Sequence, residues 1–145
     1  MTRRTTRGTW PGAAAAASAA FALVLLAACG GGGTKTTPKA LSLHGVQIPV
    51  TTLTTGLKGM CTVTHQAQNP TAAKTTYFAG PYGNLHQLAG VLHGSQTTDL
   101  LNSMAAFERD VVGTVGATST VQDANTLLGL VDRDLQSLKI SPIKC

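Results

Sequence analysis

The chain has 145 residues, of which 43% are hydrophobic and 12% are charged. This length supports one small folded domain, and the apolar share is enough to build its core. The formal net charge of +5 includes three arginines in the first seven residues, without which eight basic side chains face six acidic ones. So small an excess excludes a nucleic-acid-binding protein on charge alone.

Residues 1–28 are typical of a secretory signal peptide, because a basic start precedes an apolar stretch over residues 13–28. This stretch is shorter than the ~20 residues that a membrane-spanning helix needs. It ends in Leu26-Ala27-Ala28-Cys29, which resembles the lipobox of bacterial lipoproteins. The resemblance implies cleavage before Cys29 and a diacylglycerol on its thiol. We therefore expect a lipid anchor in the cell membrane and an extracytoplasmic domain; an uncleaved transmembrane helix is the alternative.

A linker is expected next, since the Gly30–Gly33 run and the polar residues after it show no apolar periodicity. Val46, Ile48 and Val50 alternate with other residues and predict an extended segment. The predicted organisation is therefore a signal peptide (1–28), a lipid anchor with a flexible linker or extended segment (29–50) and a helical domain (51–145).

Two helices are predicted in the first half of this domain. Apolar residues at intervals of three and four begin at Leu53 and indicate a helix from Thr51 to the Asn69-Pro70 pair. Asn69 and Pro70 are also a typical cap and first residue of a second helix, which the apolar spacing extends to His93. Gly80-Pro81 inside this helix predicts a kink, because proline removes a backbone donor.

Two further helices are predicted in the second half. Thr98 is the expected cap of the third, which ends near Gly113 or Gly116. Thr120 and Asp123 are spaced like a capping box at the start of the fourth, which continues to Leu138. Short links between such helices favour antiparallel neighbours. The predicted fold class is all-α, a small up-down four-helix bundle with a flexible lipidated tether and a C-terminal tail stapled by a disulfide.

The disulfide follows from the cysteine count. With Cys29 lipidated, Cys61 and Cys145 remain on the outer side of the membrane, where disulfides persist. The predicted bond closes a loop of about 84 residues, which the chain-entropy model values at roughly 4 kcal/mol. Two free thiols for metal or redox chemistry are the alternative, although no Cys-x-x-Cys is present.

No motif for catalysis is found, so no catalytic residue and no cofactor are predicted. The candidate ligand-binding residues are His86, Tyr82, His65 and His93. His86 and His93 share a helix face but lie about 10 Å apart along its axis, which fits one metal ion poorly. A structural role of the histidines is therefore favoured over metal binding, and the identity of any metal stays open.

The segment Tyr77–Ala89, the cysteine on the preceding helix and the final Pro-x-x-Cys resemble small lipoproteins of high-GC Gram-positive bacteria. Those proteins carry Phe-Phe-x-x-x-His-x-x-Leu-His in the second helix and end in a Pro-Cys tail. The resemblance implies a shared framework of Cys61, Cys145, Phe78, Leu85 and His86, but no activity. In this chain Tyr82 stands where the first histidine of the pattern would be.

The expected function is that of a non-catalytic binding or interaction module of the cell envelope. Its expected partners are the membrane, through the lipid on Cys29, and an envelope protein or small ligand. A copper- or zinc-binding helical bundle that uses the histidines is the alternative, and a hydrolase ranks below both.

Overall fold

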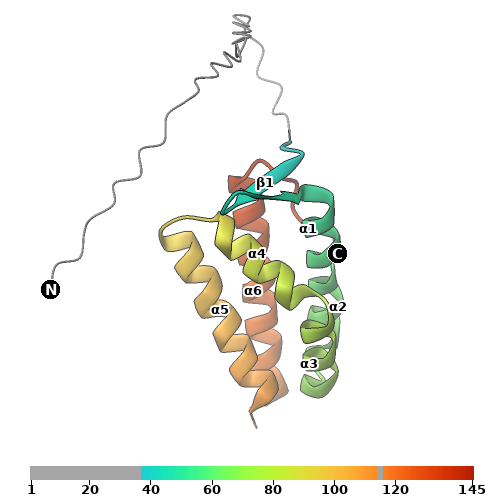
Figure 1. The fold of residues 1–145 in the computed structure, drawn as a ribbon. Helices are drawn as coiled ribbons and strands as arrows, with labels where there is room; N and C mark the ends of the chain where they lie inside the picture. Colours follow the sequence, from blue (N-terminus) through green and yellow to red (C-terminus); the bar gives the residue numbers. More distant parts are fainter. Residues whose placement is uncertain (1–36, 114–115) are drawn as a thin grey trace, which may run out of the picture. The chain divides into compact units, whose positions relative to one another are not determined.

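The computed structural model describes residues 37–113 and 116–145. The predicted signal peptide, the lipobox with Cys29 and the first part of the linker lie outside these residues, so the expectations for them stay predictions. In the described part, a two-stranded hairpin is followed by six helices (Figure 1). None of these helices is long and apolar enough to cross a membrane.

The helical class is confirmed, but with more breaks than predicted. The helices are α1 (Val50–Leu57), α2 (Gly59–Gln66), α3 (Pro70–Ala79), α4 (Pro81–Val91), α5 (Ser95–Val112) and α6 (Ala117–Ser137). The first predicted helix is divided into α1 and α2, and the second into α3 and α4. The helix α6 packs against α5 and α2, α3 packs against α2, and α4 packs against α1. Figure 1 shows α5 and α6 side by side along their lengths.

The hairpin lies in the segment that the sequence assigned to a linker or extended chain. Strand β1 (Ala40–Leu43) pairs antiparallel with β2 (Val46–Pro49). Both turn residues have positive φ, 48° at His44 and 86° at Gly45, as a two-residue type I′ turn requires. Leu41 and Ile48 lie opposite each other and are buried. These two side chains join the hairpin to the helical core.

The joint between α1 and α2 packs closely against the start of α4. A Cβ atom on Gly59 would lie 3.0 Å from Cδ of Pro81, and one on Gly56 would overlap the Asn84 side chain. A larger residue at Gly59 would therefore have to shift Pro81 slightly, and one at Gly56 would have to displace the Asn84 side chain.

The predicted start and kink of the second helix are confirmed. The Asn69 side chain accepts a hydrogen bond from the Ala72 amide at 3.1 Å, and Pro70 is the first helical residue. Helix α3 ends at Ala79 and α4 begins at Pro81, so the Gly80-Pro81 pair breaks the helix.

The predicted caps of the last two helices are wrong. Helix α5 begins at Ser95, directly after Gly94, whose positive φ of 61° turns the chain. Helix α6 begins at Ala117, one turn before Thr120. Thr120 is completely buried within α6. A capping residue has to lie at the end of its helix, whereas the Thr120 side chain is packed in the core.

Two acidic side chains lie near each other where α5 meets α6. Asp110 is buried and accepts a hydrogen bond from the Ser119 hydroxyl. Burial raises the pKa of Asp123 above its usual range; the nearby Asp110 carboxylate raises it further, and Arg109 lowers it. The folded protein therefore favours the protonated form of Asp123 more than the unfolded chain does.

Asp123→Asn is expected to stabilise the protein at neutral pH. A carboxyl group whose pKa is raised on folding contributes stability below its unfolded pKa and loses it as the pH rises through the folded pKa. Asparagine stays neutral, so the difference in free energy of unfolding between variant and wild type should grow as the pH rises from below 4 to 7. Urea unfolding across this range measures it, with Asp99→Asn, which removes an exposed partner of Arg133, as the control. Parallel pH profiles of wild type and Asp123→Asn would contradict the expectation.

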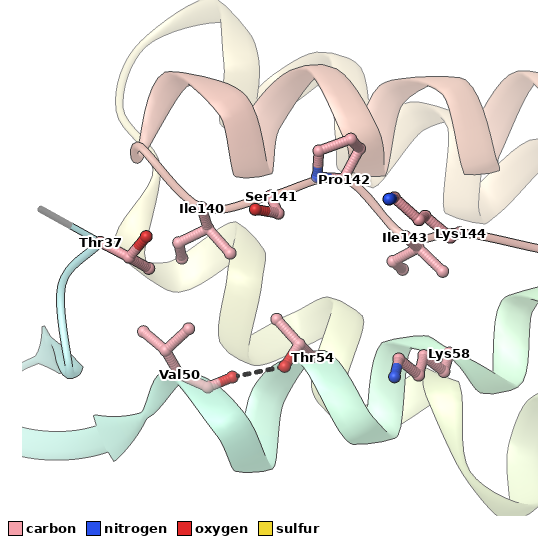
Figure 2. A pocket seen from close by; sticks show the side chains of 9 residues that line it. All are labelled: Thr37, Val50, Thr54, Lys58, Ile140, Ser141, Pro142, Ile143 and Lys144. Carbon is pink, nitrogen blue, oxygen red and sulfur yellow. Dashed lines mark hydrogen bonds between the residues drawn. The ribbon is translucent and has the colours of Figure 1, made fainter. Parts of the chain in front are cut away.

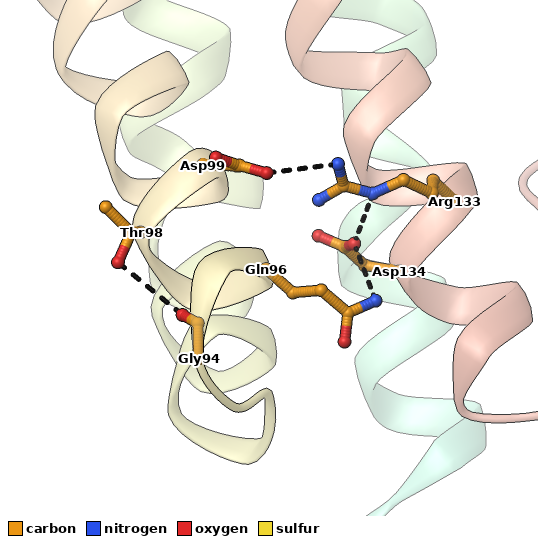
Figure 3. A network of polar contacts seen from close by, with 6 residues as sticks. All are labelled: Gly94, Gln96, Thr98, Asp99, Arg133 and Asp134. Atoms are coloured by element: carbon orange, nitrogen blue, oxygen red, sulfur yellow. Dashed lines mark hydrogen bonds and ion pairs between the residues drawn. The ribbon is translucent and has the colours of Figure 1, made fainter.

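A second polar network connects the start of α5 to the end of α6 (Figure 3). The Asp134 carboxylate is fully buried and accepts hydrogen bonds from Nε of Arg133 at 2.8 Å and Nε2 of Gln96 at 3.4 Å. Arg133 also pairs with Asp99 at 3.2 Å. Among the described residues, the other oxygen of Asp134, Oδ2, has no hydrogen-bond partner. The network fixes the two long helices to each other and leaves Asp134 without free access to solvent.

Candidate functional site

An open groove of about 410 Å³ lies between α1 and the C-terminal tail, residues 140–145. Its size is within the range of small-molecule binding sites. Figure 2 shows its two walls, one from α1 and one from the tail. The groove is lined by Thr37, Val50, Thr54, Lys58, Ile140, Ser141, Pro142, Ile143 and Lys144.

The tail takes its direction from the way α6 ends. Lys139 has a positive φ of 61°, and its amide donates to the Gln136 carbonyl at 2.9 Å. The Ile140 amide donates to the Leu135 carbonyl at 2.9 Å. These two bonds form a Schellman motif, and burial of both Ile140 and Leu135 supplies its usual apolar contact. The motif turns the chain back along α1 and places Ile140 in the groove.

Two further contacts hold the tail in place. The Ile143 amide donates to Oδ1 of Asp132 on α6 at 2.7 Å. Cys145 forms a disulfide with Cys61 on α2, with the two Cα atoms 5.3 Å apart. The structure therefore contains the predicted bond, and the groove wall opposite α1 is fixed at both of its ends.

The floor of the groove is apolar and its rim is basic. Val50, Ile140 and Ile143 are buried, whereas Lys58 and Lys144 are exposed. The Thr54 hydroxyl donates to the Val50 carbonyl at 2.8 Å, shown as a dashed line in Figure 2, and so is already used within α1.

No acidic residue lines the groove. Among residues 37–113 and 116–145, Arg133 is the basic side chain that forms ion pairs, so neither Lys58 nor Lys144 is paired there. A neighbouring depression shares Thr37, Ile140 and Ser141 with the groove and adds Lys139. The arrangement suits an anionic group attached to an apolar body.

The ligand-binding residues predicted from the sequence lie elsewhere. His65 on α2, His86 on α4 and His93 after α4 are exposed, and Tyr82 is half-buried. The structure brings Tyr82 and His86 together, with ring centroids 4.6 Å apart. None of the four lines the groove. Within the described ranges, no three His, Cys, Asp or Glu side chains are grouped so as to hold a metal ion.

The groove residues were not among the predicted site residues, although the sequence contained a signal for part of them. No acidic residue occurs before Asp99, so Lys58 has no acidic neighbour in sequence. Lys144 lies in a tail whose disulfide was predicted, and the bond from Cys145 to Cys61 brings this lysine to the part of the chain that contains Lys58, three residues before Cys61. Together, the lack of acidic residues near Lys58 in the sequence and the predicted disulfide indicate a basic surface formed by Lys58 and Lys144.

No protein-family model, curated protein or solved structure matches this chain. The fold and the groove define a small helical domain with an open, basic groove closed on one side by a disulfide-bonded tail.

Proposed function

We propose that this chain is a lipoprotein of the cell envelope whose folded domain is a non-catalytic binding module. The observation that carries the proposal is the groove, where two lysines without an ion pair in the described part of the chain flank an apolar floor. The resemblance of Leu26–Cys29 to a lipobox supports an anchor outside the cytoplasmic membrane. A diacylglycerol provides two acyl chains, which anchor a protein stably where one chain does not.

Several carboxylates have structural partners, which supports a binding rather than a catalytic role. Asp110 accepts from Ser119, Glu108 accepts from the Tyr77 hydroxyl at 3.0 Å, and Asp132 accepts from the tail. A general acid or base would have to reach a substrate. These three side chains instead hold helices and tail together.

We also propose that the domain behaves as an up-down four-helix bundle. In such a bundle, α1 and α2 together form the first helix, α3 and α4 together form the second, and α5 and α6 are the third and fourth. The short breaks support it, since Lys58 has helical backbone angles and Gly80 alone separates α3 from α4.

A photo-cross-linking amino acid at Ser141 in the full chain is expected to yield adducts in intact cells of a lipoprotein-processing bacterium. Ser141 is exposed and lines the groove, so a bound molecule lies within reach of the probe. The adducts should be recovered with the membrane fraction, and Cys29→Ala should release the protein from it. Mass spectrometry of the chain purified from the membrane and soluble fractions measures the adducts and the amount of protein in each fraction.

The control places the same probe at Thr75, an exposed residue of α3 outside the groove. It should give few adducts. If the Ser141 probe gives no more adducts than the Thr75 probe, the groove is not a binding site. If Cys29→Ala stays in the membrane, the anchor is not the lipid.

A further inference from the structure

We propose that the groove binds the headgroup region of an anionic phospholipid in the membrane that anchors the chain. This inference rests on the proposed function, and it names the chemical class of the ligand. The phosphate would lie between Lys58 and Lys144, and the apolar part of the lipid would lie along the groove floor.

The charges of the groove select an anion. Figure 2 shows the amino groups of Lys58 and Lys144 at the same end of the groove, one from each wall. Neither is paired with an acidic side chain in the described part of the chain. Lysine is a common phosphate ligand, since its ammonium group acts as a mobile point charge. The two lysines place unpaired positive charge on both walls at this end of the groove, and this charge attracts an anion.

The floor of the groove selects a molecule with an apolar part. Val50, Ile140 and Ile143 are 4–8% exposed, so their side chains contribute to the core while their edges line the groove. A free inorganic anion would leave this surface in water. A phospholipid covers it with glycerol and acyl groups and gains free energy in proportion to the apolar area covered.

The length of the chain places the groove near the membrane. Thr37 lines the groove and follows Cys29 by eight residues. Whatever conformation these residues adopt, they span at most about 28 Å. A lipid on Cys29 therefore keeps one rim of the groove within about 28 Å of the bilayer surface, where anionic headgroups are concentrated.

Lysine acetylation of the lipidated full-length mature chain in vesicles tests this placement. One set of vesicles consists of phosphatidylcholine, and in the other a third of the lipid is phosphatidylglycerol. The acetylation rates of Lys58 and Lys144 should fall about fivefold in the anionic vesicles, which corresponds to the attraction of one lysine to an anionic surface. Mass spectrometry resolves each lysine.

Lys74 on α3 is the internal control, because it is basic and does not line the groove. Its rate should change little. Ser141→Trp is the matched variant, since it fills the groove without changing any charge, and it should abolish the protection of Lys58 and Lys144. The circular dichroism spectrum and the melting temperature confirm that the variant is folded.

Soluble glycerol phosphate, added to the phosphatidylcholine vesicles, distinguishes the source of the anion. It should protect the two lysines weakly. Equal protection by glycerol phosphate would mean a soluble ligand and overturn the membrane source. Equal protection of Lys74, protection that survives in Ser141→Trp, or no protection at all would overturn the groove as the lipid site.

The result of the acetylation experiment can be distinguished from that of the cross-linking experiment. A protein adduct at Ser141, together with unprotected lysines, would support the binding module and overturn the lipid ligand. An absence of adducts at Ser141 would overturn the binding module itself.

Discussion

Replacement of both bonded cysteines, Cys61→Ser with Cys145→Ser, is expected to lower the free energy of unfolding by about 4 kcal/mol. The two residues are 84 positions apart, so the disulfide restricts most of the unfolded domain. Small domains typically have a free energy of unfolding of about 5–15 kcal/mol, so the disulfide would supply between roughly a quarter and four fifths of the total. Urea unfolding of the mature full-length chain, with and without the substitutions, measures the difference.

The reduced wild-type protein is the control for the two serines. It should lose about the same free energy, because reduction removes the same cross-link without changing the side chains. The tail keeps its other contacts, the bond from Ile143 to Asp132 and the burial of Ile140. A loss below about 1 kcal/mol would mean that these local contacts alone hold the tail, and that the loop is already restricted in the unfolded chain.

The helices were predictable because their signals are local. Apolar spacing of three and four depends on helix geometry alone, and Asn69-Pro70 and Gly80-Pro81 act on the backbone next to them. The disulfide was predictable for a different reason, since only one pairing remains once Cys29 is assigned to lipid. The placement of α3 and α4 and the bond of Cys61 to Cys145 agree with these expectations.

The features that were missed depend on contacts between distant segments. Lys58 interrupts the first helix where Gly56 and Gly59 meet α4, and nothing within α1 itself predicts that approach. The cap of α6 was misplaced because burial of Thr120 depends on the partners of the helix. The hairpin was missed because His44-Gly45 is an uncommon type I′ pair, for which Asn-Gly is the usual signal.

The candidate site was missed for the same reason, because it depends on contacts between distant segments. The histidines were selected by residue type, and the structure leaves His65, His86 and His93 exposed and outside the groove. Whether they bind a ligand stays a prediction. The groove combines residues from both ends of the domain, Val50 from α1 and Lys58 from the joint between α1 and α2 with Ile140 from the tail. The Schellman turn after α6, the bond from Ile143 to Asp132 and the disulfide bring these segments together, so residue type alone could not identify the site.

Phe107 packs against Tyr77, which contacts three aromatic rings and is the centre of the aromatic part of the core. Its ring is fully buried, and its centroid lies 5.0 Å from that of Tyr77 in an edge-to-face arrangement. Tyr77 is fully buried too, and burial together with the adjacent Glu108 raises its pKa far above the usual range. The Tyr77 hydroxyl therefore stays protonated as the donor to Glu108 and holds the ring against Phe107.

Phe107→Ala is expected to lower the free energy of unfolding by about 3–5 kcal/mol, because it removes buried apolar area and leaves a cavity. Phe78→Ala is the matched control. The Phe78 ring lies 5.1 Å from that of Tyr77, also edge-to-face, but the residue is 43% exposed. Its loss removes the ring contacts with Tyr77 and Tyr82, each worth about 0.5–1.5 kcal/mol, without opening a closed cavity. Urea unfolding of both oxidised variants measures the difference. Equal losses would mean that aromatic contacts with Tyr77, rather than burial, determine the stability of this part of the core.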